Sequence, residues 1–425
     1  MKIAVIGAGV AGLSAAYFLA RRHEVTLFEQ DARAGGHTNT VRVPLPGGGV
    51  QPVDTGWIVY NGPCYPNLTA LFRELNVPVQ KTQMSFAVSL GGGAYEWKGS
   101  DNLLTVFAQP ANVFNASHWR LIGAILRLNR ECAALLRAGT LPGGSLGEFL
   151  DARRFPAELS SRYLLPMAGL IWSCSPRQAR EYPAADFMRF FEAHGLFTTL
   201  DQPQWHSVIG GSDTYVRKLL AHFRGSLQLG TPVTALARDA RGVQVRTATG
   251  EATFDAAVCA THADQALRLL ADGDPFEREV LAGIPYNESR CVLHTDESFL
   301  PRRRAAWASW NYLNDADEVH DRPISGSYWM NLLQHIPGPV NYIVTLNPAR
   351  EIPADRILYD TRYQHPHYGA ASVATHRELA EIQGRRRLWW AGAWCGYGFH
   401  EDGLKSGLRA VQGIDAACLP AWASL

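Results

Sequence analysis

The sequence lacks several features that would have assigned it to a class of function at once. Its formal net charge is only +1 at pH 7, so its composition gives no reason to expect a nucleic acid as a partner. No run of eighteen apolar residues occurs, which excludes an ordinary membrane-spanning helix. The seven cysteines form no CxxC pair and no cysteine–histidine cluster at zinc spacing, a scatter typical of reduced, mostly buried thiols. We therefore expect no metal site.

The chain also has no room for a signal peptide before its first expected strand, which begins at Lys2. We therefore expect a cytoplasmic protein. With 425 residues and 47% hydrophobic content, the chain is long enough for two or three domains with substantial cores.

The most informative motif of the chain lies in its first forty residues. The apolar run 2–6 predicts a buried parallel strand, and a helix is expected behind it. The glycine motif over 7–12 joins the two. In that motif Gly7 permits a tight turn, Gly9 lets backbone approach a pyrophosphate, and Gly12 lets helix and strand pack closely.

An acidic residue follows the next expected strand. Residues 25–28 read Val-Thr-Leu-Phe, and Glu29 then stands where an acid can bind a ribose 2′-hydroxyl. The helix N-terminus would offer free N–H groups to the phosphates. The order of strand, glycines, helix, strand and acid predicts a dinucleotide-binding domain rather than an ordinary glycine-rich turn.

A second glycine pair lies in residues 33–38, Arg-Ala-Gly-Gly-His-Thr, and Val-Asp-Thr-Gly-Trp follows at 53–57. This arrangement resembles the flavin amine oxidase superfamily. The resemblance implies FAD, with the second glycine pair beside its pyrophosphate. An arginine usually follows that pair in the superfamily, and His37 stands in its place here.

The resemblance implies FAD contacts spread over the whole chain. These are Gly7, Gly9, Ala11, Gly12, Glu29, Gln30, Gly35, Gly36, His37, Thr38, Gly56, Trp57, Val233, Gly392, Ala393, His400, Asp402, Gly403 and Leu404. A strand over 387–394 and a helix over 404–417 would complete the domain, with the helix N-terminus directed at flavin N1 and O2, where reduced flavin carries negative charge. The FAD is expected to be non-covalent, because no cysteine occurs between Cys291 and Cys395.

The expected fold class is α/β: a Rossmann-like FAD-binding domain of the amine oxidase type with an inserted α+β substrate domain. The FAD-binding domain is expected to comprise residues 1–84, 207–285 and 380–425, and the substrate domain residues 85–206 and 286–379. Strands are expected around 291–294, 306–310, 327–330 and 342–345.

Within the substrate domain, apolar residues over 118–138 follow the spacing of one helical face. Arginines 120, 127, 130 and 137 punctuate the same helix. One interpretation is a helix packed on the core with solvated arginines, and the other is an interfacial helix whose arginines meet anionic lipid headgroups. Arginines 302–304 would serve the same surface or form a charged loop. Tryptophans 307, 310 and 329 would line a substrate cavity or fill its core.

A narrower resemblance rests on residues 392–403, read together with 171–174, 194–196 and 363–366. These segments resemble a bacterial group of FAD-binding oxidoreductases that accompany cyclopropane-fatty-acid-synthase-like methyltransferases. The resemblance implies desaturation of a methyl-branched fatty acyl chain of a phospholipid. It also implies a lipid substrate, peripheral contact with the inner face of the cell membrane and a methyltransferase partner. The sequence does not determine the oligomeric state, and a homodimer is compatible with it.

Desaturation needs a hydride acceptor, flavin N5, and a proton acceptor near the neighbouring carbon. His400 and Glu401, expected beside the flavin, are the first candidates, with Tyr397 and His194 behind them. The alternative for His400 is a hydrogen bond that stabilises the loop.

Other functions stay open at this stage. An amine oxidase could use Tyr397 and Trp394 as two walls of an aromatic cage, although no acidic residue can be placed at an amine entrance. A carotenoid or other polyprenyl desaturase, an NAD(P)H-dependent reductase of a methylene-fatty acyl chain, and a non-catalytic flavoprotein that scaffolds the methyltransferase are the further alternatives.

Overall fold

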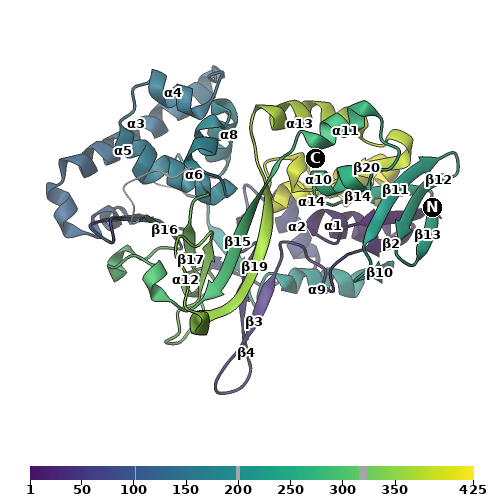
Figure 1. Ribbon diagram of the computed structural model, residues 1–425, viewed down its shortest axis with the longest axis horizontal. Coiled ribbons are helices and arrows are strands. Elements are labelled where there is room, and N and C mark those ends of the chain that lie inside the picture. The colour runs from purple at the N-terminus through teal and green to yellow at the C-terminus, as the bar shows by residue number, and fades with distance from the viewer. Residues whose placement is uncertain (101, 198–201, 315–322) are drawn as a thin grey trace.

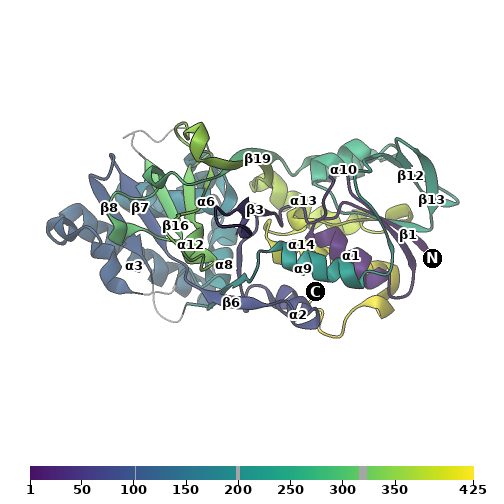
Figure 2. The ribbon, with the colours of Figure 1, turned by 90° about the horizontal axis from the view of Figure 1, so that it is seen from below.

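The computed structural model describes residues 1–425 except 101, 198–201 and 315–322. The chain forms two domains that lie end to end along the long axis of the molecule (Figures 1 and 2). Domain 1 contains both termini and a five-stranded sheet, and domain 2 contains a seven-stranded sheet covered by helices. Among the described residues no helix is long and apolar enough to cross a bilayer.

The sheet of domain 1 is parallel and is assembled from distant parts of the chain. Its strand order is β10 (Ser226–Gln228), β2 (Glu24–Phe28), β1 (Lys2–Ile6), β14 (Ala256–Cys259) and β20 (Leu388–Trp390). Side chains alternate between its two faces, as strand geometry requires. Ile3 and Val5 lie in the core shared with α1 (Val10–Leu19) and α14 (His400–Asp415), whereas Ala4 and Ile6 lie in the core on the other face.

The elements around that sheet belong to three segments of the chain. On the first face lie α2 (Pro66–Glu74) and α9 (Asp213–His222). On the second lie the meander β11 (Val233–Asp239), β12 (Gly242–Thr247) and β13 (Gly250–Phe254), with α10 (Ala263–Leu269), α11 (Pro275–Ala282) and α13 (Ala370–Ile382). Because Leu379 and Ile382 of α13 pack in this core, the last segment of domain 1 begins before residue 380, the predicted boundary.

Domain 2 is built on a mostly antiparallel sheet. Its order is β19 (Ile357–Pro366), β15 (Tyr286–His294), β18 (Ile343–Leu346), β17 (Gly326–Trp329), β16 (Trp310–Asn314), β7 (Phe86–Leu90) and β8 (Tyr95–Gly99). The helices that share its core are α3 (Ala116–Ala138), α4 (Leu146–Ala152), α5 (Ala157–Leu159), α6 (Leu165–Trp172), α7 (Pro176–Glu181) and α8 (Ala184–Ala193). The long pair β15 and β19 runs between the two domains in Figure 1.

Smaller elements complete the fold. The hairpin of β3 (Thr40–Pro44) and β4 (Val50–Asp54) projects from the molecule in Figure 1, and a three-stranded sheet joins β5 (Val59–Asn61), β9 (Trp205–Val208) and β6 (Val79–Thr82). The helix α12 (Met330–Leu333) follows β17. Two 3-10 helices, η1 (Leu103–Phe107) and η2 (Pro110–Phe114), precede α3.

Two predicted elements differ from the structure. The strand expected over 306–310 is wrong, because residues 304–306 form a 3-10 turn and β16 begins only at Trp310. Helix α14 begins at His400 rather than at 404, because the carboxylate of Asp402 accepts hydrogen bonds from the N–H groups of Tyr397 and Phe399, both at 3.0 Å. That carboxylate closes the turn before the helix, so the glycine-rich turn is shorter than predicted.

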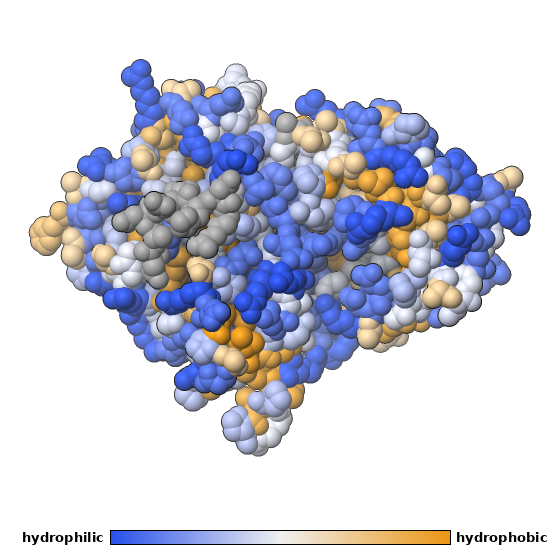
Figure 3. Space-filling model, in the orientation of Figure 1, coloured by the Kyte–Doolittle hydropathy of each residue, from blue (hydrophilic) through white to orange (hydrophobic). Residues whose placement is uncertain are grey.

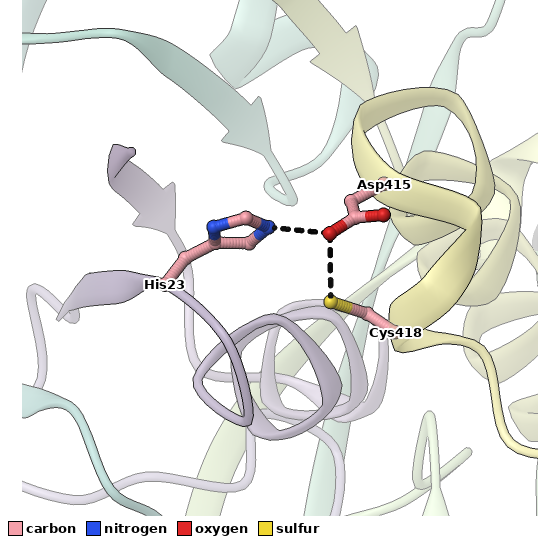
Figure 4. A group of neighbouring side chains, drawn as sticks. All are labelled: His23, Asp415 and Cys418. Atoms are coloured by element: carbon pink, nitrogen blue, oxygen red, sulfur yellow. Dashed lines mark hydrogen bonds and ion pairs between the residues drawn. The ribbon is translucent and has the colours of Figure 1, made fainter.

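Ionic contacts tie the C-terminal end of α14 to the turn between α1 and β2 (Figure 4). The carboxylate of Asp415 lies 3.0 Å from His23 Nε2, 3.4 Å from Arg22 Nε and 3.6 Å from Cys418 Sγ. Burial raises the pKa of the Cys418 thiol to about 11, so the thiol is protonated at neutral pH. These contacts therefore join two elements of domain 1.

A buried arginine links the meander to α11. The side chain of Arg238 is fully buried, and its guanidinium lies 2.5 and 2.7 Å from the two carboxylate oxygens of Glu277 and 3.2 Å from Asp272. Removal of one member of such a pair leaves an uncompensated buried charge.

Arg238→Ala is therefore expected to lower the free energy of unfolding by about 3–5 kcal/mol. Arg241→Ala is the matched control, because it removes an ion pair with Asp239 whose arginine side chain is 74% exposed, and it should leave stability unchanged. Urea unfolding measures both variants, and equal effects would contradict a structural role for the buried pair.

Candidate functional site

A cavity of about 1020 Å³ is lined by both domains. The predicted FAD contacts that line it are Gly7, Gly9, Ala11, Glu29, Gln30, Gly35, Gly36, His37, Gly56, Trp57, Val233, Gly392, Ala393 and His400. The predicted contacts Gly12, Thr38, Asp402, Gly403 and Leu404 are not among the lining residues and lie behind this wall. The structure thus brings most of the predicted set together around one space.

The glycine motif forms an open cradle at one part of the cavity. Gly7 has φ +97°, and a Cβ on Gly12 would overlap the carbonyl oxygen of Gly7, so both positions require glycine. Gly9 differs, because a Cβ there would meet no protein atom within 4 Å. The N-terminus of α1 carries no side-chain cap and no acidic residue in its first turn. Its free N–H groups and the space at Gly9 fit a pyrophosphate.

Glu29 and the second glycine pair complete the cradle. The Glu29 carboxylate accepts hydrogen bonds from the N–H groups of Ala8 (2.7 Å) and Asp31 (3.0 Å), and lone pairs remain for a ribose hydroxyl. Gly36, at φ +55°, lies on the first motif, since a Cβ there would be 3.2 Å from the Cα of Gly9. The residues present therefore fit the nucleotide part of FAD.

Three histidines from separate segments gather in the cavity wall. His37 lies with its ring centroid 5.9 Å from that of His262 and 5.3 Å from that of His365. Burial lowers the pKa of all three, and that of His365 falls to about 4, so these rings are neutral at pH 7. His37 Nε2 and His365 Nδ1 are buried and have no hydrogen-bond partner among the described residues. The sequence predicted only His37 as a cofactor contact, and it singled out His365 only within the segment 363–366, because no local pattern connects the three histidines.

His400 lines the cavity and is held firmly. Its Nε2 lies 2.7 Å from the Tyr215 hydroxyl and 3.2 Å from Thr38 Oγ1, and its ring stacks on Trp57 with centroids 4.4 Å apart. Burial lowers the pKa of His400 to about 3, so it is neutral at pH 7. Its position is that of a neutral, hydrogen-bonded wall residue.

The other two predicted catalytic residues, Glu401 and Tyr397, form hydrogen bonds outside the cavity. The Glu401 carboxylate accepts hydrogen bonds from the N–H groups of Asn67 and Leu68, both at 3.0 Å, and so caps the N-terminus of α2. Burial raises the pKa of this carboxyl group. The Tyr397 hydroxyl lies 3.3 Å from Asp186. Neither Glu401 nor Tyr397 lines the cavity, so the structure does not bring them together with His400 there.

His194 does line the cavity. Its Nδ1 lies 2.9 Å from the carbonyl oxygen of Phe190, and because a carbonyl only accepts, Nδ1 carries the proton. Nε2 then bears the lone pair, with no partner in the described part of the chain. Burial lowers the pKa of His194 to about 4, and its ring centroid lies 5.3 Å from that of Phe399, the residue before α14. His194 is thus a neutral base at neutral pH.

The part of the cavity inside domain 2 is mostly apolar, with a few polar side chains such as His118 and Asn129. It is lined by Phe86, Trp97, Val106, Leu121, Ile122, Ile125, Leu126, Tyr163, Met167, Leu170, Ile171, Phe190, Leu196 and Trp310. Among the described lining residues of domain 2, the one carboxylate is Glu288 of β15, which is paired with Arg362 of β19.

The sequence did not decide whether tryptophans 307, 310 and 329 line the cavity or fill a core, and the structure shows both roles. Trp310 lines the cavity, whereas Trp307 and Trp329 pack edge-to-face in a separate core. Trp394 lines the cavity, with its Nε1 donating to the carbonyl of Thr261.

Arg303 pairs with buried Glu96, and Arg304 lies over Trp307, so the arginine run 302–304 is a charged loop fixed to domain 2.

Substitution at Gly9 separates cofactor binding from folding. Gly9 has φ −74° and ψ −179°, a conformation open to any residue, so Gly9→Ala should leave the melting temperature of the apoprotein unchanged. Its methyl group enters the space of the pyrophosphate and should weaken FAD binding at least about tenfold. Gly12→Ala is the contrasting variant, expected to unfold at lower temperature. Thermal melts and flavin absorbance measure both, and full flavin content in the Gly9 variant would contradict the site.

The comparisons with known proteins agree with this geometry. Residues 10–338 match the family of flavin containing amine oxidoreductases. The chain is 46% identical to an L-amino-acid oxidase of Pseudechis australis over 75 residues (17% of this chain, 13% of that protein). It is 24% identical to an L-amino acid dehydrogenase of Synechocystis over 274 residues (60% of this chain, 55% of that protein). The matches thus span about half, or less, of those relatives.

A solved structure, that of a CLA-producing fatty acid isomerase from P. acnes, matches with a TM-score of 0.68 and 16% identity, over 95% of this chain and 96% of that one. This likeness shows the fold. The family model matches more than half of the sequence, so the chain belongs to the flavin containing amine oxidoreductase family.

Proposed function

We propose that this protein is an FAD-dependent desaturase of a methyl-branched fatty acyl chain carried by a phospholipid. The observation that carries the proposal is the polarity of the cavity. Its domain 1 part holds the uncapped N-terminus of α1 and Glu29, whereas its domain 2 part is lined mostly by apolar side chains, and Glu288, the domain 2 carboxylate among the described lining residues, is paired with Arg362. Such a wall suits a long hydrocarbon better than an ammonium group.

The FAD would be bound without a covalent bond and would supply the hydride acceptor at N5. None of the described lining residues is a cysteine, and Cys395 lies outside the wall. The cradle residues Gly7, Gly9 and Glu29 would hold the nucleotide part. The methyltransferase partner implied by the sequence resemblance would place the methyl branch before this enzyme acts.

His194 is the proton acceptor in this proposal. Formation of the double bond removes a hydride from one carbon and a proton from its neighbour, and the two electrons of the second C–H bond become the π bond. His194 Nε2 can take that proton because Nδ1 is fixed as a donor to Phe190. His400 holds Trp57 and Tyr215 in place and stays neutral.

Oxidation of an amine is the second candidate, because the relatives named above include an amino acid oxidase and an amino acid dehydrogenase. The aromatic cage expected for it is incomplete, since Trp394 lines the cavity and Tyr397 does not. Polyprenyl desaturation fits the same apolar wall and differs in the length of the hydrocarbon.

Anaerobic titration of the purified flavoprotein distinguishes these functions. Phospholipids with a methyl-branched acyl chain are expected to bleach the visible absorbance of the flavin, and unbranched phospholipids are expected to do so more weakly. Bleaching by amines or amino acids alone would overturn the proposal in favour of amine oxidation. Bleaching only by polyprenyl hydrocarbons would assign the alternative desaturation.

His194→Gln should slow flavin reduction by about a hundredfold or more, while FAD content and melting temperature stay unchanged. His222→Gln is the matched control, because His222 Nδ1 also contacts the carbonyl four residues earlier, at 2.8 Å, but is exposed on α9. In the wild type, the rate should persist above pH 4 and fall as pH drops through about 4, where His194 becomes protonated. Stopped-flow reduction across pH measures this, and an unchanged rate in His194→Gln would remove the residue from catalysis.

A further inference from the structure

Large apolar side chains are exposed together at one end of domain 2. The exposed fractions are 78% for Leu104, 45% for Val113, 91% for Phe114, 50% for Trp119 and 54% for Leu126. These five residues, here called the apolar surface patch, come from η1, η2 and α3, which lie in the half of the molecule opposite the termini (Figures 1 and 2). Hydrophobic side chains also appear at that end of the space-filling view (Figure 3).

Specific contacts hold the segments of the apolar surface patch together. The indole Nε1 of Trp119 donates to the carbonyl of Val113 at 2.8 Å, and the ring of Phe107 lies 5.3 Å from that of Trp119 and 5.5 Å from that of His118. The exposed apolar groups therefore belong to an ordered surface. Patches of this kind mark sites of interaction with a membrane or a partner.

The apolar surface patch is continuous with the apolar part of the cavity. Leu126 belongs to both, since it is half exposed and also lines the cavity. Ile122 and Ile125 line the cavity from the same helix, and Val106 lines it from η1. A hydrocarbon chain that enters beside α3 would therefore meet the side chains of Leu126, Ile122 and Ile125 between the surface and the cavity.

Positive charge surrounds this entrance. Residues 102–138 contain four arginines and one acidic residue, Glu131. Arg120 is paired with Glu158 at 2.7 Å, and Glu131 is shared between Arg127 at 2.7 Å and Arg153 at 3.8 Å. Arg130 and Arg137 are exposed and have no ion-pair partner in the described part of the chain. Two free cations beside apolar side chains complement an anionic lipid surface.

We propose that the apolar surface patch docks on an anionic phospholipid bilayer, with Leu104, Phe114 and Trp119 at the depth of the acyl boundary and Arg130 and Arg137 at the headgroups. The cavity mouth at Leu126 then faces the acyl chains, and the substrate enters from the bilayer. The proposal rests on the proposed function for the identity of the substrate. A water-soluble protein partner would explain the apolar patch but not its continuity with the cavity.

Vesicle co-sedimentation of the holoprotein tests the docking. The wild type should bind vesicles of equal parts phosphatidylglycerol and phosphatidylcholine at least about tenfold more tightly than vesicles of phosphatidylcholine alone, and added salt should reduce the difference. Leu104→Ser/Phe114→Ser should bind at least about tenfold more weakly with unchanged melting temperature, because both side chains are largely exposed. Arg130→Glu/Arg137→Glu should lose the preference for anionic vesicles.

Leu45→Ser/Val50→Ser is the matched control, since it removes two exposed apolar side chains from the β3–β4 hairpin and should leave vesicle binding unchanged. Failure of the wild type to bind any vesicle, or equal binding by Leu104→Ser/Phe114→Ser, would overturn the proposal. A dimer in sedimentation velocity that Phe114→Ser dissociates, without vesicle binding, would assign the patch to a second copy of the chain.

The experiments distinguish failure of the docking proposal from failure of the proposed function. Vesicle binding that depends on the patch, in a protein whose flavin no lipid reduces, would support docking and overturn acyl desaturation. Reduction by detergent-dispersed phospholipid at the same rate in wild type and Leu104→Ser/Phe114→Ser would locate the defect of that variant in membrane binding rather than in chemistry.

Discussion

The close approach of helix α1 to the backbone around it is the constraint on which the cofactor site depends. A Cβ on Gly12 would overlap the Gly7 carbonyl, and a Cβ on Gly407 of α14 would overlap the Ala11 carbonyl from the other side. Gly36 lies against Gly9 in the same way. Because three backbone segments converge on one helix terminus without side chains between them, the N–H groups of α1 stay open to the cavity.

The position of α14, the second helix that reaches the cavity, depends on this packing. Helix α14 lies along α1, and its Gly403 approaches Val10 so closely that a Cβ there would lie 2.7 Å from the Val10 side chain. Its N-terminus is therefore fixed relative to the glycine cradle. The cap of that helix uses Asp402, and Glu401 turns outward to cap α2, so the two acids in the first turn serve helix ends rather than the reaction. Burial raises the pKa of Asp402 to about 6.

The sequence predicted the parts of the site that local backbone geometry determines. The glycines over 7–12, Glu29 and the pair Gly35–Gly36 act within a few residues of themselves, so their spacing alone indicated the cradle. Glu401 failed as a catalytic candidate because its partners, Asn67 and Leu68, lie more than 330 residues away. Local sequence carries no trace of such a contact.

Helix α3 is a second example of what local sequence leaves undetermined. Its periodicity predicted one apolar face, but the structure divides its apolar residues among three environments. Leu128 is fully buried in the core, Leu121, Ile122 and Ile125 line the cavity, and Trp119 and Leu126 reach the surface, with Leu126 also lining the cavity. The two interpretations offered for this helix, core packing and contact with lipid, are therefore not exclusive. A helical period fixes the direction of a side chain, whereas the neighbouring elements decide what it meets.

The contrast in polarity along the cavity also bears on how a base can work there. An imidazole deep among apolar side chains loses solvation when it is charged, which is why the pKa of His194 is lowered to about 4. A low pKa makes it a weaker base but keeps it unprotonated over the whole neutral range. The hydrogen bond to Phe190 fixes which nitrogen is basic, and the turn of α8 that supplies this carbonyl also carries Phe190 into the cavity wall. The element that shapes the apolar wall thus also orients the nitrogen beside it.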